Sequence, residues 1–408
     1  MAYLFDFKQK LQDFLVDEKL PFILKDEGVF LYIHIEKEKK TTMEIVDFLL
    51  KTYKLPKNAI GFAGLKDKHG ITRQWFSFDA DIVSRILRTK KFEKLLSIWL
   101  SWVCKVLKTG WYNQKLTTKD DLHNGFVIRL RSKKHKLSEQ EREIVEWVLK
   151  DSLAMPSFPN YFGEQRFGVN GRNIYEGQRI LNGYDKSITG FDRIFKLQAY
   201  TSDLFNQILE RRISQGKAPI DGDLLLINKK IYLYYQDEIY LQSDRHQKGK
   251  FFIFTKFTSP QDFNSKVPYQ IILPVLGFNS LIPHHEMFFG KWMYNFMKKN
   301  SITPENWKIY EELKIFWTLR TMQMSLKNPT WKWMDDDIIL KFELEAGSYA
   351  SVVVDQLLKT IKTKLDKIRL AKPVSSDPVI LPQHRQTKKA KPHRKWKSKP
   401  KDKKVAKV

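Results

Sequence analysis

Two segments of the chain carry hydrophobic patterns that are typical of β-strands. Residues 30–35, FLYIHI, form a short apolar run rich in aromatic and β-branched residues, which predicts a buried strand. Residues 124–131 alternate instead, with Phe126, Ile128 and Leu130 on one face and two arginines on the other. This second pattern predicts a half-buried strand with a basic outer side.

Helical periodicity follows both strands. The segment from Thr41 to Glu44 fits a capping box, in which a threonine hydroxyl caps the helix and the glutamate reaches back, and apolar residues then repeat at helical spacing. Ser138 and Glu141 give a second capping box of the same kind. Further helices are predicted over residues 95–107, over 201–213 and from 347 onward. The segment 95–107 is too short to span a bilayer, so we expect it to bury one face in the core.

The remaining patterned segments read as loops and short strands. Residues 160–171 contain three glycines and predict a structured loop. Residues 227–241 predict short strands, and residues 331–344 predict an aromatic and acidic turn that enters another strand. With 408 residues, 42% of them hydrophobic, the chain is long enough for a large core and for two or three domains.

The charge of the chain favours a polyanionic partner. The formal net charge is +26, and residues 385–408 hold 12 Lys or Arg against one acid, so the body of the chain is basic without its end. Basic surface neutralises phosphates and releases counterions, which indicates nucleic acid. The alternative is a lysine-rich proteome in which the excess has no function. From about residue 371 prolines recur and lysine dominates, which predicts a disordered tail. This tail is either an RNA-binding arm, a nuclear targeting signal or a solubilising appendage.

Cysteine and histidine usage argues against several classes of protein. A single cysteine, Cys104, excludes a disulfide within the chain and a thiolate metal cluster, and suits a reducing compartment. The histidines do not fall into ligand spacings, so zinc chemistry is disfavoured. The first ten residues lack the apolar core of a signal peptide. We therefore expect no metal site and no membrane association.

One segment, residues 61–70 (GFAGLKDKHG), carries candidate chemistry. Two glycines allow a sharp turn, and Asp67 stands between Lys66 and Lys68, whose charges favour the ionised carboxylate. An ionised aspartate among cations could act as a nucleophile toward an RNA base. Such a Lys-Asp-Lys sequence is more often a solvated loop. The segment lacks the phosphate-loop and dinucleotide-binding glycine patterns, so a nucleotidase is a weaker alternative.

The same segment resembles the signature of the TruD family of tRNA pseudouridine synthases. The match covers residues 63–69 with Thr72, Gln74 and Trp75 after them, and it lies within a resemblance over roughly residues 5–360. Other matching stretches, in the same order as in the family, are Lys8 with residues 12–18, residues 124–126, residues 160–168, residues 202–206, residues 221–223, residues 331–336 and residues 347–351.

This resemblance implies an α+β fold. The family has a pseudouridine synthase catalytic domain with a mixed, mainly antiparallel sheet and an inserted α/β TRUD-type domain. In this chain the catalytic domain maps to residues 1–159 and 319–370, the insertion to 160–318, and the basic disordered tail to 371–408. The substrate base would lie in a basic cleft between the two domains.

The resemblance also implies site residues and a reaction. Asp67 matches the catalytic aspartate, which attacks uridine so that the base can rejoin the sugar through carbon 5. Phe126 matches the aromatic residue that stacks on the target base, Asn124 would hold the segment or the substrate, and Lys8 matches a lysine near the aspartate. Weaker candidates for substrate binding are Lys66, Lys68, Gln74 and Arg166, of which Arg166 could instead brace the domain junction. No cofactor is expected.

Substrate and location follow less directly. The expected partner is tRNA, modified at position 13, with other RNA as an alternative and a monomeric enzyme in the cytoplasm, or in the nucleus of a eukaryote. Departures from the family pattern occur at Leu11-Gln12, at His123, at Leu319 and at Asp355. A non-catalytic RNA-binding protein on the same scaffold remains the main alternative.

Overall fold

The fold is described from a computed structural model of the chain. It describes residues 3–66, 68, 70–117, 120, 122–134, 136–185, 187–241, 252–254, 260–262, 266–278, 280–283 and 286–371. The chain divides into one compact unit, Met1–Asp366, and a second unit, Lys367–Val408. The predicted disordered tail from residue 371 lies almost wholly outside the described residues.

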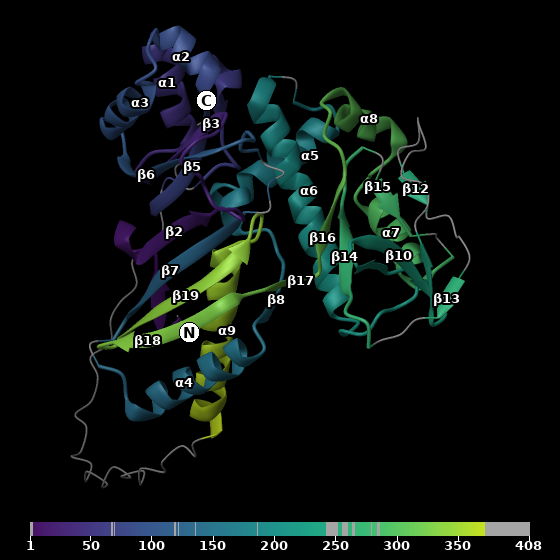
Figure 1. The fold of residues 1–408 in the computed structure, drawn as a ribbon. Coiled ribbons are helices and arrows are strands. Elements are labelled where there is room, and N and C mark those ends of the chain that lie inside the picture. The colour runs from purple at the N-terminus through teal and green to yellow at the C-terminus, as the bar shows by residue number, and fades with distance from the viewer. Residues whose placement is uncertain are drawn as a thin grey trace, which may run out of the picture. The chain divides into compact units, whose positions relative to one another are not determined.

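Within the described ranges, nine strands form the larger sheet (Figure 1), in the order β18-β19-β7-β2-β5-β3-β6, with β1 beside β7 and β4 beside β5. Within this sheet the described pairings are antiparallel except that of β2 with β5, which is parallel. The strands are β1 (Phe5–Phe7), β2 (Phe14–Lys19), β3 (Phe30–Glu38), β4 (Ile60–Gly61), β5 (Ile71–Asp79), β6 (Lys105–Tyr112), β7 (His123–Ser132), β18 (Lys327–Met334) and β19 (Asp337–Glu345). This mixed, mainly antiparallel sheet confirms the predicted fold class.

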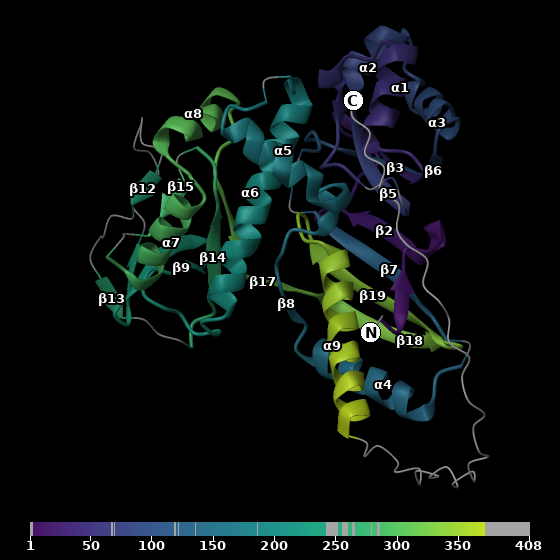
Figure 2. The same cartoon turned by 180° about the vertical axis from the view of Figure 1, so that it is seen from behind.

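Helices cover one face of this sheet in two groups. The first group is α1 (Thr42–Tyr53), α2 (Ala80–Leu87) and α3 (Phe92–Ser101), whose apolar residues share a buried cluster with β3 and β5. The second is α4 (Glu139–Ala154) and α9 (Ala350–Ala371), which pack against β7 and β19. Figure 2 shows the two groups at different ends of the strand order. The start of α9 and the loop before β5 therefore meet near the middle of the sheet.

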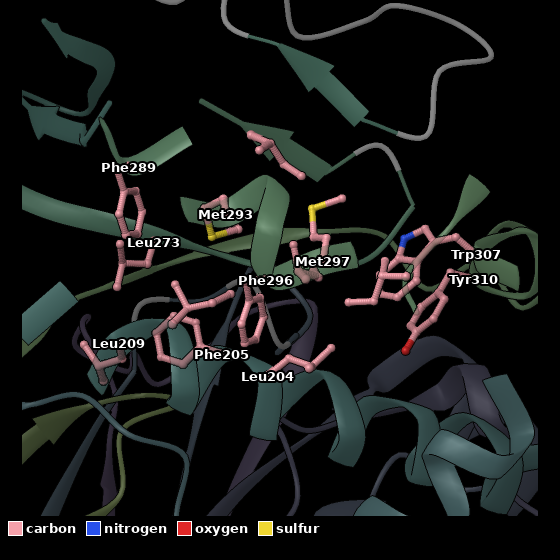
Figure 3. Close-up of a cluster of buried hydrophobic side chains, with 14 of the residues drawn as sticks. Leu204, Phe205, Leu209, Leu273, Phe289, Met293, Phe296, Met297, Trp307 and Tyr310 are labelled. Carbon is pink, nitrogen blue, oxygen red and sulfur yellow. The ribbon is translucent and has the colours of Figure 1, made fainter. Parts of the chain in front are cut away.

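A second sheet contains six strands in the described part of the chain, in the order β13-β11-β10-β9-β14-β16. These are β9 (Leu224–Ile227), β10 (Lys230–Tyr235), β11 (Glu238–Leu241), β13 (Pro260–Asp262), β14 (Gln270–Val275) and β16 (Thr318–Thr321). Its helices are α5 (Arg172–Leu181), α6 (Gly190–Ile213), α7 (Phe288–Lys299) and α8 (Pro304–Glu312). Phe205 and Leu209 of α6 and Met293 of α7 belong to one buried cluster between these helices and the sheet (Figure 3).

Two short pairs of strands complete the fold. They are β8 (Ser157–Pro159) with β17 (Gln323–Ser325), and β12 (Phe252–Phe254) with β15 (Ser280–Ile282). The predicted boundary between residues 318 and 319 falls inside β16, which pairs with β14 of the second sheet. The division into a catalytic and an inserted domain stays a prediction. Within the described ranges, no helix combines the length and the apolar character that crossing a bilayer requires.

Local sequence signals account for several elements. Both predicted capping boxes are present, at Thr41 with Glu44 and at Ser138 with Glu141. The strand predicted over 124–131 is β7, in which Phe126, Ile128 and Leu130 are buried. The hairpin of β18 and β19 turns at Asp335 and Asp336, as the acidic turn predicts.

One helix prediction is wrong at its end. The helix predicted over residues 95–107 stops at Ser101, and β6 begins at Lys105. The reason is long-range pairing: β6 forms an antiparallel ladder with β3, from Lys105 opposite Glu36 to Tyr112 opposite Phe30. Sheet pairing across the fold thus overrides the local helical period.

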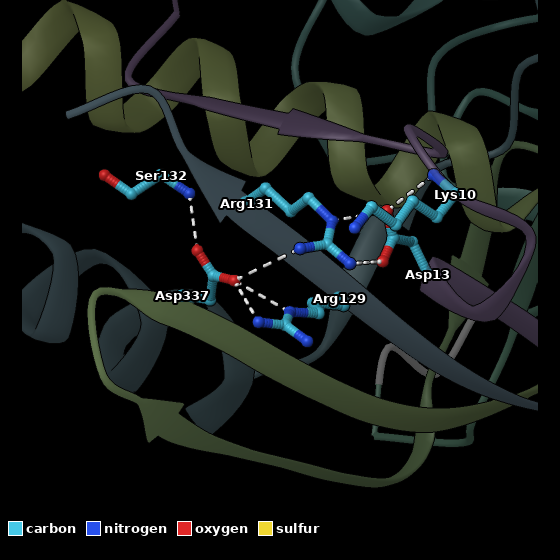
Figure 4. A network of polar contacts seen from close by, with 6 residues as sticks. All are labelled: Lys10, Asp13, Arg129, Arg131, Ser132 and Asp337. Carbon is cyan, nitrogen blue, oxygen red and sulfur yellow. Dashed lines mark hydrogen bonds and ion pairs between the residues drawn. The ribbon is translucent and has the colours of Figure 1, made fainter. Parts of the chain in front are cut away.

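A polar network fixes the sheet at its basic outer side (Figure 4). Arg131 donates to both carboxylate oxygens of Asp13, at 2.6 and 2.7 Å, and Arg129 donates to Asp337 at 2.7 Å. Asp337 also accepts a hydrogen bond from the backbone amide of Ser132 at 2.8 Å. The arginines predicted on this face therefore join the segment before β2 to β7 and β19.

Candidate active site

A cavity of about 440 Å³ opens where β2, β5 and β7 meet the loop before β5 and the start of α9. The lining residues that the sequence predicted for the site are Lys66, Asn124 and Phe126. The other lining residues are Phe14, Val16, Ala63, Gly64, Leu65, Thr72, Asp120, Leu122, Gln165, Ala346, Gly347, Ser348, Tyr349, Ala350 and Ser351. Segments that are far apart in the sequence thus form a single concave surface.

Asp67, the predicted catalytic carboxylate, lies outside the described residues. Its neighbours on both sides are described. Lys66 lines the cavity, and the Lys68 ammonium pairs with Glu44 at 3.1 Å on the exposed side of the capping box of α1. The hydrogen bond from the Thr41 amide, helped by Lys68, lowers the pKa of Glu44 to about 2.

Buried polar side chains hold the loop that leads to Asp67. Thr42 at the start of α1 accepts a hydrogen bond from the Lys66 amide at 3.0 Å and donates to the side chain of Gln74 at 2.9 Å. The amide group of Gln74 donates in turn to the carbonyl of Gly64 at 2.9 Å. The ammonium of Lys37, which is almost fully buried, donates to the carbonyl of Lys66 at 3.3 Å. These contacts fix the backbone on the near side of the cavity.

Lys66 is also held through its side chain. Its ammonium forms an ion pair of 2.5 Å with Glu18 of β2, whose side chain is wholly buried. Glu18 accepts a second hydrogen bond, from the Trp75 amide, at 2.9 Å. Burial raises the pKa of the Glu18 carboxyl, and the Lys66 charge and the Trp75 amide oppose that rise. The side chain of Lys66 is therefore held by Glu18, and Lys66 also lines the cavity.

Phe126 and Asn124 lie on β7 and form the opposite wall. Phe126 is 7% exposed and packs between Phe14, at 6.0 Å between ring centroids, and Phe342, at 5.5 Å. The Oδ1 atom of Asn124 is buried and has no hydrogen-bond partner among the described residues. A buried acceptor without a partner is costly, which is consistent with a group that awaits a donor from a ligand.

Lys8 lies near the cavity, next to Phe14. Its backbone has φ +60°, an uncommon conformation for a residue other than glycine, where the chain turns between β1 and β2. Its ammonium lies 4.0 Å from the centroid of the Phe14 ring, and Phe14 lines the cavity. Lys8 thus lies close to the site through its contact with Phe14.

Two weaker candidates are placed differently from the rest. Gln74 is fully buried, and its side chain bonds to Thr42 and to the carbonyl of Gly64, so its geometry fits positioning of the loop. Arg166 is not among the residues that line the cavity, whereas its neighbour Gln165 is. The Arg166 guanidinium lies over the Phe195 ring at 5.2 Å and donates to Gln198 at 3.1 Å, and burial lowers its pKa.

Arg320 supports the lining residues 346–351, and the sequence analysis did not identify it as part of the site. Its guanidinium donates to the carbonyl of Gly347 at 2.8 Å, and to the carbonyl and side-chain oxygen of Asn160 at 2.8 and 2.5 Å. It also lies 4.4 Å from the centroid of the Phe162 ring, and burial lowers its pKa to about 10. Arg320 therefore ties the segment 160–162 to the lining residues 346–351. The bracing role considered for Arg166 fits Arg320 better.

Comparison with known proteins identifies the family. The profile of the family described as tRNA pseudouridine synthase D (TruD) matches residues 5–188 and 186–357. The chain belongs to the TruD family. A relative from Vibrio cholerae, named tRNA pseudouridine synthase D, is 27% identical over 354 residues, which cover 86% of this chain and 87% of the relative. A relative of the same name from Psychrobacter arcticus is 30% identical over 57% of this chain and 64% of its own length.

A solved structure supports the fold. The chain from Methanosarcina mazei, assigned to tRNA pseudouridine synthase D, superimposes with a TM-score of 0.55 at 18% identity, covering 88% of this chain and 94% of that one. At this identity the likeness concerns the fold alone.

Proposed function

We propose that this protein converts uridine to pseudouridine in tRNA, with Asp67 as the nucleophile. Family membership supports the reaction class. The observation that carries the proposal for the site is the cavity, which has Phe126 and Asn124 on one wall and, on the other, a loop that is anchored up to Lys66, the residue before Asp67 in the sequence.

The reaction suits a site of this kind. The carboxylate attacks the uridine, on the ring or on the sugar, and the bond between N1 and C1′ breaks. The base turns, and a bond forms between C5 and C1′. The bond between the carboxylate and the nucleoside breaks, the proton on C5 leaves and N1 gains one, which returns the free carboxylate. The change is an isomerisation without net oxidation or reduction, so neither a redox cofactor nor an added group enters its balance.

Each nearby residue has a proposed part. Phe126 stacks against the base, because an extruded base in a protein pocket is held by aromatic faces and by hydrogen bonds to its edge. Asn124 offers Oδ1, the acceptor without a described partner, to an N–H of the base. Lys8 and Lys66 supply positive charge near the phosphates and the carboxylate. Position 13 of tRNA, a monomeric state and a cytoplasmic location belong to the same proposal.

The test is direct. Unmodified transcripts of a full tRNA set are incubated with the protein, and pseudouridine is mapped by carbodiimide modification and primer extension. We expect one modified uridine in a subset of the transcripts. A set in which no transcript acquires pseudouridine overturns the proposal and favours a protein that binds RNA without modifying it.

A further inference from the structure

A basic surface lies away from the cavity, at the turn between α2 and α3. We call it the α2–α3 ridge and define it by five exposed side chains: Arg85, Arg88, Lys90, Lys91 and Lys94. Residues 85–94 contain these five cations and one acid, Glu93. For comparison, residues 160–318 hold 21 Lys or Arg against 16 Asp or Glu. The ridge thus concentrates into ten residues nearly the same excess of positive charge as that long segment.

The ridge also has few ion-pair partners in the part of the chain that the structure describes. None of the five cations forms an ion pair with a carboxylate among the described residues. The carboxylate of Glu93 instead accepts a hydrogen bond from Thr109 at 2.7 Å. Two arginines of the larger sheet provide a contrast, since Arg73 pairs with Glu36 and Arg129 pairs with Asp337. Arg85 donates to the backbone carbonyl of Asp81 at 3.0 Å, one turn earlier in α2. The ridge therefore keeps a net positive charge within the described part of the chain.

Three of these cations stand where they weaken the fold. Lys90, Lys91 and Lys94 lie at the start of α3, the positive end of the helix dipole, where cations are unfavourable. Lys91 is the N-cap residue and makes no side-chain cap hydrogen bond, although Ser, Thr, Asp or Asn would supply one. Helix stability therefore does not account for this arrangement.

The ridge continues into an exposed apolar line on the same helix. Ile98 is 42% exposed, and Trp102, the C-cap residue of α3 with helical backbone angles, is 67% exposed. The two follow Lys94 at intervals of four residues, which places the three side chains along one side of α3 and its end. A flat aromatic surface beside a row of cations matches the sugars and bases that flank a phosphate backbone.

We propose that the α2–α3 ridge binds the phosphate backbone of the RNA substrate at a distance from the uridine that reacts. This inference rests on the proposed function, because that function supplies the RNA. The ridge adds affinity that does not depend on sequence, through release of counterions. Phe126 and the cavity select the base, and the ridge holds the rest of the molecule.

The test compares two triple variants with the wild type. The first is Lys90→Gln with Lys91→Ser and Lys94→Gln, which removes three charges and gives α3 a capping serine. The control is Lys217→Gln with Lys230→Gln and Lys291→Gln, which removes three exposed lysines outside the ridge. Affinity for an unmodified tRNA transcript is measured by fluorescence anisotropy between about 50 and 200 mM KCl, with thermal unfolding of each variant in parallel.

For the ridge variant we expect at least a tenfold loss of affinity. The slope of log K against log salt becomes shallower by about two, since each lost phosphate contact contributes roughly 0.7 to 0.9. Its unfolding temperature stays equal to or above that of the wild type, so misfolding does not explain the loss. For the control variant we expect a slope that differs from that of the wild type by less than the contribution of one phosphate contact.

Two outcomes overturn the inference: an unchanged slope in the ridge variant, or an equal change in the control. Vesicles with anionic phosphatidylglycerol provide a further arm, and loss of vesicle binding with unchanged RNA binding identifies a membrane surface instead. The affinity measurement does not require turnover. If the wild type makes no pseudouridine, the proposed function fails, whereas the salt dependence of RNA binding still tests the ridge separately.

Discussion

Thr42 and Gln74 are 32 residues apart in the sequence, yet the Thr42 hydroxyl donates to the Gln74 side chain at 2.9 Å. Both side chains are fully buried, and together they bind Gly64 and Lys66 of the loop that precedes Asp67. A catalytic side chain must be held within a fraction of an ångström of its productive position. We interpret the pair as the support that positions this loop.

Replacement of Thr42 tests that interpretation. Thr42→Val keeps the shape but removes the hydroxyl, which leaves the Lys66 amide and the Gln74 oxygen without a partner. We expect kcat to fall about tenfold or more, because misplacement of a catalytic group by 1 Å can cost about a hundredfold, and affinity for RNA to change little. Single-turnover kinetics with a tRNA transcript measure both. Thr42→Ser retains the hydroxyl and should remain close to the wild type; equal activity of the two variants would contradict the role.

The ion pair of Lys66 with Glu18 predicts that removing the lysine alone destabilises the protein more than replacing both residues. Lys66→Met leaves a buried carboxylate without its cation, which costs about 3–5 kcal/mol of unfolding free energy. The double variant with Glu18→Gln should recover part of that loss, because the neutral amide can still accept from the Trp75 amide. Urea unfolding of the four proteins gives the coupling free energy. If Lys66→Met lowers the unfolding free energy by less than about 1 kcal/mol, the pair behaves like a solvent-exposed ion pair, which would contradict the expected cost of leaving Glu18 buried without its cation.

Arg320 predicts a dependence on guanidinium geometry. Its several donors bind the Asn160 and Gly347 oxygens at the same time, which an ammonium cannot reproduce. We expect Arg320→Lys to lower the unfolding free energy by about 2–4 kcal/mol, the cost of leaving one or two buried oxygens without a donor, and to raise KM for RNA. Arg172→Lys, on an exposed pair with Glu176, is the control and should change stability by about 0.5 kcal/mol or less. Similar losses for both variants would argue against the brace.

Asp13 predicts how stability responds to acid. Burial raises the pKa of its carboxyl, but hydrogen bonds from Arg131 and from the Lys10 amide outweigh burial, and the net pKa lies below 3.8. The unfolded chain therefore binds the proton more readily than the folded one. The contribution of Asp13 to stability is fully present above pH 3.8 and is lost as the pH falls through the lower folded value. We expect Asp13→Asn to make the unfolding temperature depend less steeply on pH between about pH 6 and 2. A dependence as steep as that of the wild type would contradict this role of Asp13.

The sequence predicts those parts of the fold that local patterns control. Residues with a period of two or with caps became β7, α1 and α4, because burial of one face and satisfaction of the first helical amides are local requirements. The strand β6 was missed as a strand, since its pairing with β3 depends on residues about 70 positions earlier. The β16 strand, at the predicted domain boundary, has no local signal that distinguishes it from a linker.

The site shows the same division. Lys66, Asn124 and Phe126 were predicted and line the cavity, because motif order placed them. Gln74 was predicted to bind substrate, but its described contacts serve the loop. Thr42 and Glu18 lie in segments that the sequence analysis singled out, but neither was given a role in the site. A threonine at the start of a helix has the same sequence pattern whether or not its hydroxyl supports a catalytic loop, so the sequence alone does not reveal the role of Thr42. The pairing of the buried Glu18 with Lys66 becomes visible only when the fold brings the two side chains together.

The replacement of Asp67 by asparagine tests the central claim most directly. Asparagine keeps the shape of the side chain but cannot act as the nucleophile. Pseudouridine formed in a single turnover is measured on the tRNA transcript that the wild type modifies, with RNA affinity measured on the same preparations. We predict that Asp67→Asn forms no detectable pseudouridine and binds the transcript within about threefold of the wild type, a change of less than 1 kcal/mol. Formation of pseudouridine by Asp67→Asn at the wild-type rate would contradict the account.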